Sequence, residues 1–368
     1  MKNYLLAVLI SSPVLLAAQK KVDLDRYKVR VQFRSLPAMQ IDSSYHTYSV
    51  EVESTRMMQN FLTGLSPEKT VDLKGWRKLP EQGHLQIKIK LEDLLPESVS
   101  VKERVENIKN KSGQITGTRT LYQQEVVYSF AARAVITDYK GMHIIDEVLA
   151  DRAYKQTFTS PEFAFKKLAE GYFLLNSLAT TGDLYRHCVT RAMHFLNERI
   201  TNNFGYEEVT ANDVMWIVDS KKHPEYDAHR KAFRQLNDVL FAMAADQPLG
   251  NLRTELQPVI AYFDGIKKTY DTESKHDRKM RYASYYNLAV LYYYLDDPQS
   301  MMKEATGLIL NDYDTRDGKK FEESANRLKN EFQRTNIYSR HFKIDPQTFK
   351  GPFEAQDQSL NNNTKVYQ

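Results

Sequence analysis

The chain has 368 residues, of which 42% are hydrophobic and 27% are charged, so it is long enough for two domains with cores of their own. Its 51 Lys and Arg residues are nearly matched by 47 Asp and Glu residues, and this balance argues against a nucleic-acid-binding surface. With a single cysteine, Cys188, the chain cannot form a disulfide within itself, so its stability must come from packing.

Residues 1–18 are predicted to be a signal peptide. Lys2 is followed by an apolar run from Leu5 to Leu16, and Ala17-Ala18 supplies small residues for cleavage before Gln19. The run is too short to span a bilayer, and no later segment is apolar enough to anchor the chain. This short signal, ending in LLAAQ, resembles those of Bacteroidota envelope proteins. We therefore expect an exported protein, either periplasmic or outer-membrane-associated or extracellular, with no integral membrane segment after cleavage.

Residues 19–158 are predicted to form a β-rich domain. Three segments, 27–34, 48–53 and 85–91, alternate apolar and polar residues in the way that half-buried strands do. The polar residues of the first segment are mostly basic and those of the second are mostly acidic. If these two strands pair, cross-strand charges would favour that register.

A long hairpin is predicted later in the same domain. Its turn is expected at residues 109–113, which combine Lys, Asn, Ser and Gly between two runs of β-branched residues. Gly141 marks a second hairpin turn, because glycine tolerates the left-handed backbone conformation found there. These features indicate an antiparallel sheet, with a short helix expected near residues 57–62.

Residues 159–342 are predicted to form a helical domain. Ser160 suits the N-cap of a first helix, and Pro161 suits its first position. Apolar residues then recur on two helical stripes, one at Leu168, Tyr172 and Leu175 and the other at Leu184, Cys188, Ala192, Phe195 and Leu196. A short helix around Trp216 is expected at residues 214–218.

Further helices are predicted at residues 224–245 and 252–270, then in a hairpin from Tyr282 to Tyr313, and finally after Asp317 as an N-cap. The last segment, 343–368, is rich in Gln, Asn, Asp and Pro and is expected to be disordered. The predicted fold class is therefore α+β, with an N-terminal antiparallel β-rich domain followed by an α-helical hairpin domain.

The hairpin at residues 282–315 resembles one tetratricopeptide repeat. Tyr285, Leu288, Ala289 and Tyr292 are spaced as large, Leu, small and Tyr residues are in the first helix of that family. The resemblance implies an array of helical hairpins whose concave surface binds peptides or proteins. The alternative interpretation is a helical domain whose last hairpin uses Tyr and Ala for packing alone.

The residues best suited to chemistry have simpler explanations. Cys188 follows His187, but neighbouring residues on a helix point to different faces, and Cys188 lies on an apolar stripe, so we expect a buried structural thiol. His187 and His194 lack a third ligand for zinc. The acidic turn at residues 312–323 fails as a calcium loop, because Arg316 takes the fifth position, so a turn between two helices is expected.

The predicted function is binding rather than catalysis. Short motifs of the common enzyme classes are missing from the sequence, and we predict no catalytic residue, no metal and no cofactor. In the run of three tyrosines, at least one must leave the core face, so Tyr293 and Tyr294 are the candidate binding residues. We expect a non-enzymatic binding or scaffold protein of the bacterial envelope that holds a protein or peptide partner. The alternative is an envelope hydrolase or a glycan-binding protein with a site between the two domains.

Overall fold

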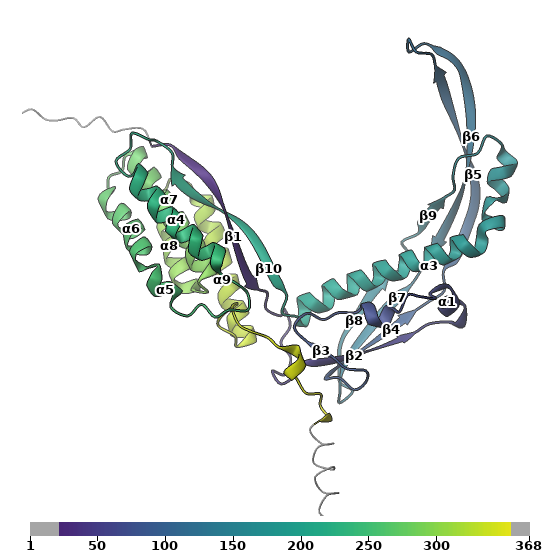
Figure 1. The fold of residues 1–368 in the computed structure, drawn as a ribbon, viewed down its shortest axis with the longest axis horizontal. Coiled ribbons are helices and arrows are strands. Elements are labelled where there is room, and N and C mark those ends of the chain that lie inside the picture. The colour runs from purple at the N-terminus through teal and green to yellow at the C-terminus, as the bar shows by residue number, and fades with distance from the viewer. Residues whose placement is uncertain (1–21, 355–368) are drawn as a thin grey trace, which may run out of the picture. The chain divides into compact units, whose positions relative to one another are not determined.

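The structure is a computed structural model and describes residues 22–354; the predicted signal peptide and the end of the predicted tail lie outside this range. The described chain forms two compact units (Figure 1). The helical unit contains residues 22–33 and 209–342, and the sheet unit contains residues 34–208 and 343–354. The units do not follow the boundary expected between residues 158 and 159, because the first long helix packs on the sheet.

The sheet unit is built around a five-stranded sheet with the strand order β3-β2-β4-β7-β8. The strands are β2 (Thr47–Glu53), β3 (Arg77–Lys78), β4 (Leu85–Leu91), β7 (Ala132–Asp138) and β8 (His143–Ala150). Strand β2 runs parallel to β3 and β4, whereas β4-β7 and β7-β8 are antiparallel pairs. The acidic side chains of β2 lie beside the lysines of β4, and Lys88 Nζ is 2.6 Å from Glu53 Oε1. The acidic side chains of β2 therefore face the lysines of β4, and β2 does not pair with the basic segment at residues 27–34.

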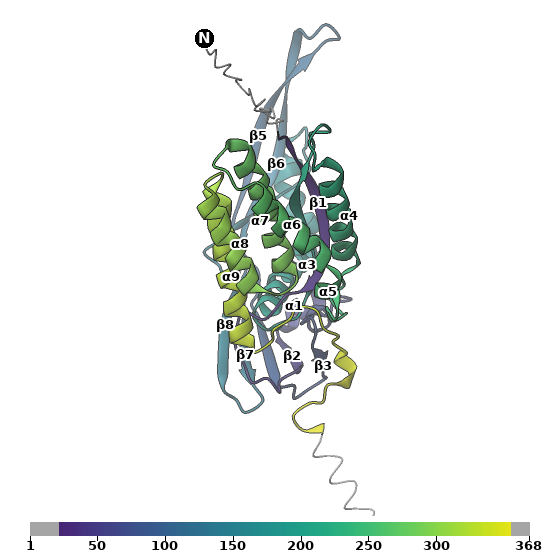
Figure 2. The same cartoon turned by 90° about the vertical axis from the view of Figure 1, so that its left-hand side faces the viewer.

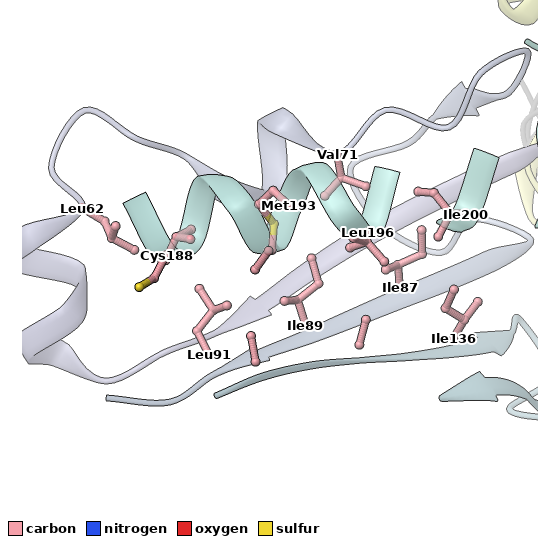
Figure 3. Packing of buried hydrophobic residues seen from close by; sticks show 14 of the residues in the cluster. Leu62, Val71, Ile87, Ile89, Leu91, Ile136, Cys188, Met193, Leu196 and Ile200 are labelled. Atoms are coloured by element: carbon pink, nitrogen blue, oxygen red, sulfur yellow. The ribbon is translucent and has the colours of Figure 1, made fainter. Parts of the chain in front are cut away.

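Helix α3 (Lys166–Phe204) covers one face of this sheet. Its buried stripe includes Cys188, Met193, Leu196 and Ile200, which Figure 3 shows lying over apolar residues of β4 and β7. The alternation predicted for residues 85–91 is confirmed, because every second residue of β4 is buried under this helix. The packing of helix on sheet therefore forms the core of the unit.

A long hairpin forms a second, three-stranded sheet in the same unit. It consists of β5 (Leu95–Lys109) and β6 (Ile115–Ser129), and β9 (Gln156–Thr159) pairs with the base of β6. The predicted hairpin is thus confirmed, as are the helix α1 (Arg56–Phe61) and the turn at Gly141, whose φ is 83°. A short helix, α2 (Pro67–Thr70), follows α1. Figures 1 and 2 show the hairpin extending well past the five-stranded sheet.

The predicted helix start at Ser160 is wrong. Helix α3 begins at Lys166 with Phe165 as its N-cap. Ser160 is buried, and its hydroxyl accepts a hydrogen bond from the backbone N–H of Gln124 on β6 at 2.8 Å. Residues 160–163 therefore stay extended beside the hairpin. Their backbone groups form hydrogen bonds with Gln124 and Tyr122 of β6, and a helix starting at Ser160 would break these bonds.

The helical unit packs helices against a two-stranded ribbon. The strands β1 (Leu24–Arg34) and β10 (Glu208–Val218) pair with each other. The helices are α4 (Tyr226–Ala242), α5 (Leu252–Glu255), α6 (Gln257–Thr269), α7 (Lys275–Tyr294), α8 (Pro298–Asn311) and α9 (Thr315–Thr335). Helix α7 packs against α6 and α8, and α8 packs against α9. Val29 and Val31 of β1, with Met215 and Ile217 of β10, enter the core formed by these helices.

Two details of the helical unit correct the sequence prediction. Residues 214–218 form the end of β10 and not a short helix, because Met215 and Ile217 alternate into the core while β1 supplies the backbone partners. Helix α9 is capped by Asp314, whose side chain accepts from the backbone N–H of Arg316 at 3.2 Å. The predicted cap, Asp317, lies in the first turn and accepts a hydrogen bond from the hydroxyl of Tyr282 at 2.7 Å.

The first part of the predicted disordered tail is folded onto the sheet unit. It contains the short helix η1 (Pro346–Thr348). Arg77 donates hydrogen bonds to the carbonyl of Phe349 at 2.6 Å and to the Glu354 carboxylate at 2.8 Å. The ring of Phe349 stacks on His46 with centroids 4.5 Å apart. The prediction is therefore wrong for residues 343–354, and residues 355–368 lie outside the described part of the chain.

The fold class is α+β, as predicted: strand-rich sheets come first and a helical region follows. Within residues 22–354, every helix is too short or too polar to cross a membrane.

Candidate functional site

The two tyrosines predicted to bind a partner are engaged inside the helical unit. Tyr294 is only 2% exposed, and its hydroxyl donates a hydrogen bond to the Asp213 carboxylate at 3.1 Å. Tyr293 is half-buried, and the guanidinium carbon of Arg340 lies 4.3 Å from the centre of its ring. Both side chains therefore already have partners within the unit.

Arg340 closes over Tyr293 and forms a buried ion pair. Its guanidinium also lies 4.4 Å from the ring centre of Phe33, so it is held between two aromatic rings. Arg340 Nε donates to Asp296 Oδ1 at 2.7 Å, and both side chains are 2% exposed. Asp296 is in the turn between α7 and α8 with a φ of 57°. This cluster fixes the segment after α9 onto the α7–α8 turn.

The other residues of the tetratricopeptide-like pattern pack as predicted. Leu288 and Ala289 are fully buried, and Tyr292 is 8% exposed. The half-buried ring of Tyr285 covers Gly307 of α8 so closely that a Cβ added there would lie 2.3 Å from a ring carbon. Glycine at this position therefore allows α7 and α8 to approach, and the predicted packing role of the pattern is confirmed.

Cys188 is the buried structural thiol that the sequence predicts. Burial raises its pKa to about 11, which disfavours the thiolate that a nucleophile requires. His187 and His194 are both exposed on α3, and His194 Nε2 lies 3.5 Å from Glu198 on the same helix. Across the described residues, His, Cys, Asp and Glu side chains form no group of three or more arranged to hold a metal.

An exposed apolar face lies on the first part of α3, and we call it the leucine face. Its members are all strongly exposed: Phe165 (69%), Leu168 (55%), Leu174 (80%), Leu175 (83%) and Leu178 (75%). Single exposed apolar residues are common on protein surfaces, but five within fourteen residues of one segment form a patch. Such patches mark surfaces that bind other molecules.

The sequence shows the helical spacing of these leucines, but it does not show whether they face the core or the solvent. Leu168, Gly171, Leu175 and Leu178 recur at intervals of three, four and three residues, the spacing of a helix that packs along another helix. The sequence prediction assigned Leu168 and Leu175 to a stripe together with Tyr172. In the structure Tyr172 is half-buried, and its ring contacts Phe158 and Phe163, whereas the leucines face away.

A buried glutamine holds this part of α3 against the hairpin. The Gln124 side chain of β6 accepts a hydrogen bond from the backbone N–H of Phe173 at 2.7 Å and donates to the Glu170 carbonyl at 2.9 Å. Figure 1 shows the first part of α3 running beside the hairpin, and α3 packs against β6. The leucine face is therefore presented by a helix that is fixed in place.

Burial of the leucine face by a partner would contribute favourable free energy to binding. Full burial of one leucine side chain contributes roughly 1.5–3 kcal/mol. Because the four leucines are between 55% and 83% exposed, most of this contribution is unused in the isolated chain. A partner that covers them would gain several kcal/mol before the cost of association is subtracted.

The hairpin beside the leucine face also presents apolar side chains. Val99, Val105, Ile108 and Ile115 are each between 46% and 61% exposed. Strand β5 is an edge strand of its sheet over 15 residues, so its outer backbone groups lack a neighbouring strand in the described chain. Lys102 and Arg104 place charges along this edge, which discourages uncontrolled strand pairing.

Comparison with known proteins adds no relative to this description. No protein-family model matches the chain, and no curated protein matches it. The tetratricopeptide-like character of residues 282–315 therefore stays a prediction, and function must be argued from the surfaces described above.

Proposed function

We propose that this chain is a non-enzymatic binding or scaffold protein of a bacterial cell envelope and that it holds a protein partner on the leucine face. The observation that carries the proposal is the exposure of four leucines, at 55–83%, on one side of a fixed helix. Helix α3 lies within residues 159–342, where the sequence predicts the partner site, but it packs in the sheet unit. The proposal moves the binding residues from Tyr293 and Tyr294, which are engaged internally, to α3.

A protein partner suits this surface for two reasons. The leucines follow a helical spacing along roughly three turns, which matches the length over which two helices pack. Their side chains present no hydrogen-bonding group, so the face suits an apolar surface better than a sugar or a nucleotide. The envelope location rests on the predicted signal peptide and on the resemblance of that signal to Bacteroidota export signals.

The proposal is tested by site-specific photocrosslinking in the native envelope. A photoreactive amino acid is placed at position 175, and crosslinked products of the mature protein are isolated and identified. We expect one stoichiometric protein partner. The matched control carries the same group at position 310, because Leu310 is 79% exposed and belongs to α8 of the helical unit, whereas the leucine face belongs to the sheet unit. Equal products from both positions, or none from position 175, would contradict the proposal.

A substitution pair measures the contribution of the face. Leu175→Glu and Leu178→Glu each place a charge within it, and each is expected to weaken partner capture by at least tenfold, since the burial of one leucine is worth about 1.5–3 kcal/mol. Leu310→Glu introduces the same change on an equally exposed leucine and should leave capture unchanged. Circular dichroism melting curves confirm that all three variants are folded.

A further inference from the structure

A cavity of about 540 Å³ lies in the sheet unit, away from the leucine face. One wall is formed by α3, where Cys188, Arg191, Ala192 and Phe195 follow one another at helical spacing. The other walls come from the end of β8, from Phe130 and from the segment between β8 and β9. The volume falls within the range of ligand sites, about 300–1,000 Å³.

The lining of the cavity is partly apolar and partly polar. Phe130, Leu149, Ala192 and Phe195 contribute apolar side chains, and Asp151, Lys155, Gln156 and Arg191 contribute polar ones. The thiol of Cys188 is a weak donor and has no hydrogen-bond partner in the described chain. A ligand that fills this space must therefore be partly apolar and partly polar.

The rim of the cavity is held in place by ion pairs. Arg152, in the segment between β8 and β9, donates to Glu92 at 3.1 Å and to the Asp93 carbonyl at 2.9 Å. Lys155 pairs with Glu97 at 2.7 Å. These contacts fix the segment that closes one side of the cavity, so the site exists before any ligand binds.

The guanidinium of Arg191 has no ion-pair partner among residues 22–354. Arg191 is exposed and lines the cavity, yet it forms no hydrogen bond or ion pair with any residue between 22 and 354. The acidic residue of the rim, Asp151, accepts a hydrogen bond from the backbone N–H of Ala153 at 2.9 Å. Apolar side chains beside an unpaired guanidinium are complementary to a molecule with an apolar body and an anionic head.

We propose that this cavity binds an aliphatic carboxylate, with the hydrocarbon chain against Phe130, Leu149 and Phe195 and the carboxylate bound by Arg191. The site is separate from the leucine face and does not depend on the proposed scaffold function. Arginine suits the role because its planar fork can donate two parallel hydrogen bonds to a carboxylate.

The test uses decanoate below its micellar concentration and the mature full chain, with binding followed by isothermal titration calorimetry. We expect saturable binding of one decanoate per chain. Decanol, which keeps the chain but lacks the charge, should bind about tenfold more weakly, and butanoate, which keeps the charge but lacks the chain, should not bind measurably. Equal affinity for decanoate and decanol, or no saturation with decanoate, would overturn the proposal.

Variants then locate the site. Arg191→Gln should weaken decanoate binding by about tenfold and leave decanol binding unchanged. The matched control is Arg327→Gln, an exposed arginine of α9 whose guanidinium bonds only to Ser324. Binding that survives Arg191→Gln at full strength means that decanoate binds elsewhere and the proposal is wrong.

Discussion

The side chain of Asn287 holds both backbone polar groups of Trp216. Trp216 N–H donates to Asn287 Oδ1 at 2.8 Å, and Asn287 Nδ2 donates to the Trp216 carbonyl at 2.8 Å. Asn287 is fully buried in α7, and Trp216 is in β10. The indole of Trp216 lies against the rings of Tyr282 and Tyr286, with centroids 5.9 and 6.1 Å away. Helix α7 therefore binds the backbone of β10, an extended strand of the same chain.

This contact gives the first prediction. Asn287→Ala removes both hydrogen bonds and leaves two backbone groups of a partly buried strand without their partner, so it should lower the free energy of unfolding by about 2–4 kcal/mol. Urea unfolding followed by tryptophan fluorescence measures the change. The control is Asn176→Ala, which removes an exposed asparagine with a single bond to the Tyr172 carbonyl. Equal effects of the two substitutions would show that the strand does not depend on Asn287.

The buried pair of Arg340 and Asp296 gives the second prediction. Arg340→Met should cost about 3–5 kcal/mol, because it leaves a buried carboxylate without its partner. Asp296→Asn keeps a residue that tolerates the positive φ of this turn. The double variant should cost less than the sum of the two single variants, and their difference measures the coupling. Additive effects would show that the two side chains act independently. Arg327→Met serves as the control for removing an exposed arginine.

Local patterns in the sequence are enough to predict the strands that have one solvated face. The segments at 27–34, 48–53 and 85–91 alternate because one side of each is buried, and each is a strand in the structure. The sequence predicts a helix around Trp216 because the run of apolar residues there hides the alternation. Its strand partner, β1, lies about 180 residues earlier, and pairing over that distance leaves no local signal.

The leucine face shows a second limit of sequence reasoning. A single helix carries two apolar stripes, and the one containing Cys188 is buried whereas the one containing Leu175 is exposed. Both have helical spacing, so periodicity alone cannot tell which one meets the core. The sequence likewise gives no signal for the cavity beside Arg191, because its lining joins Phe130 and residues of β8 and β9 to α3, and only the fold brings them together.

The third prediction concerns pH. His229 of α4 is fully buried against Tyr262 and Phe263, and neither ring nitrogen has a hydrogen-bond partner in the described chain. Burial, with a smaller contribution from His223 and Arg230, lowers the pKa of His229 from 6.5 to about 4. Burial also lowers the pKa values of His46, His84 and His341.

Proton binding determines the direction in which folding stability changes with pH. Between pH 6.5 and about 4 the unfolded chain binds a proton at His229 and the folded chain does not, so folding stability falls as pH falls through this range. The loss from this one residue approaches roughly 3 kcal/mol near pH 4. His229→Leu, of similar volume, should reduce the difference in unfolding free energy between pH 7.5 and pH 5. An unchanged pH dependence in this variant would mean that His229 is not a source of the acid sensitivity.

The last prediction concerns the glutamine that fixes the leucine face. Gln124 bonds to two backbone groups of α3, so Gln124→Leu should loosen the first part of that helix from β6. Loss of two buried hydrogen bonds, at about 1 kcal/mol each, corresponds to a tenfold or greater rise in amide hydrogen exchange for residues 166–178. Residues 184–204 are held by the core of the five-stranded sheet and should exchange as before. The neighbouring Gln123→Leu is the matched control, because the Gln123 side chain bonds only to the Ser160 carbonyl. If exchange in residues 166–178 is the same in both variants, the leucine face is held in place by other contacts.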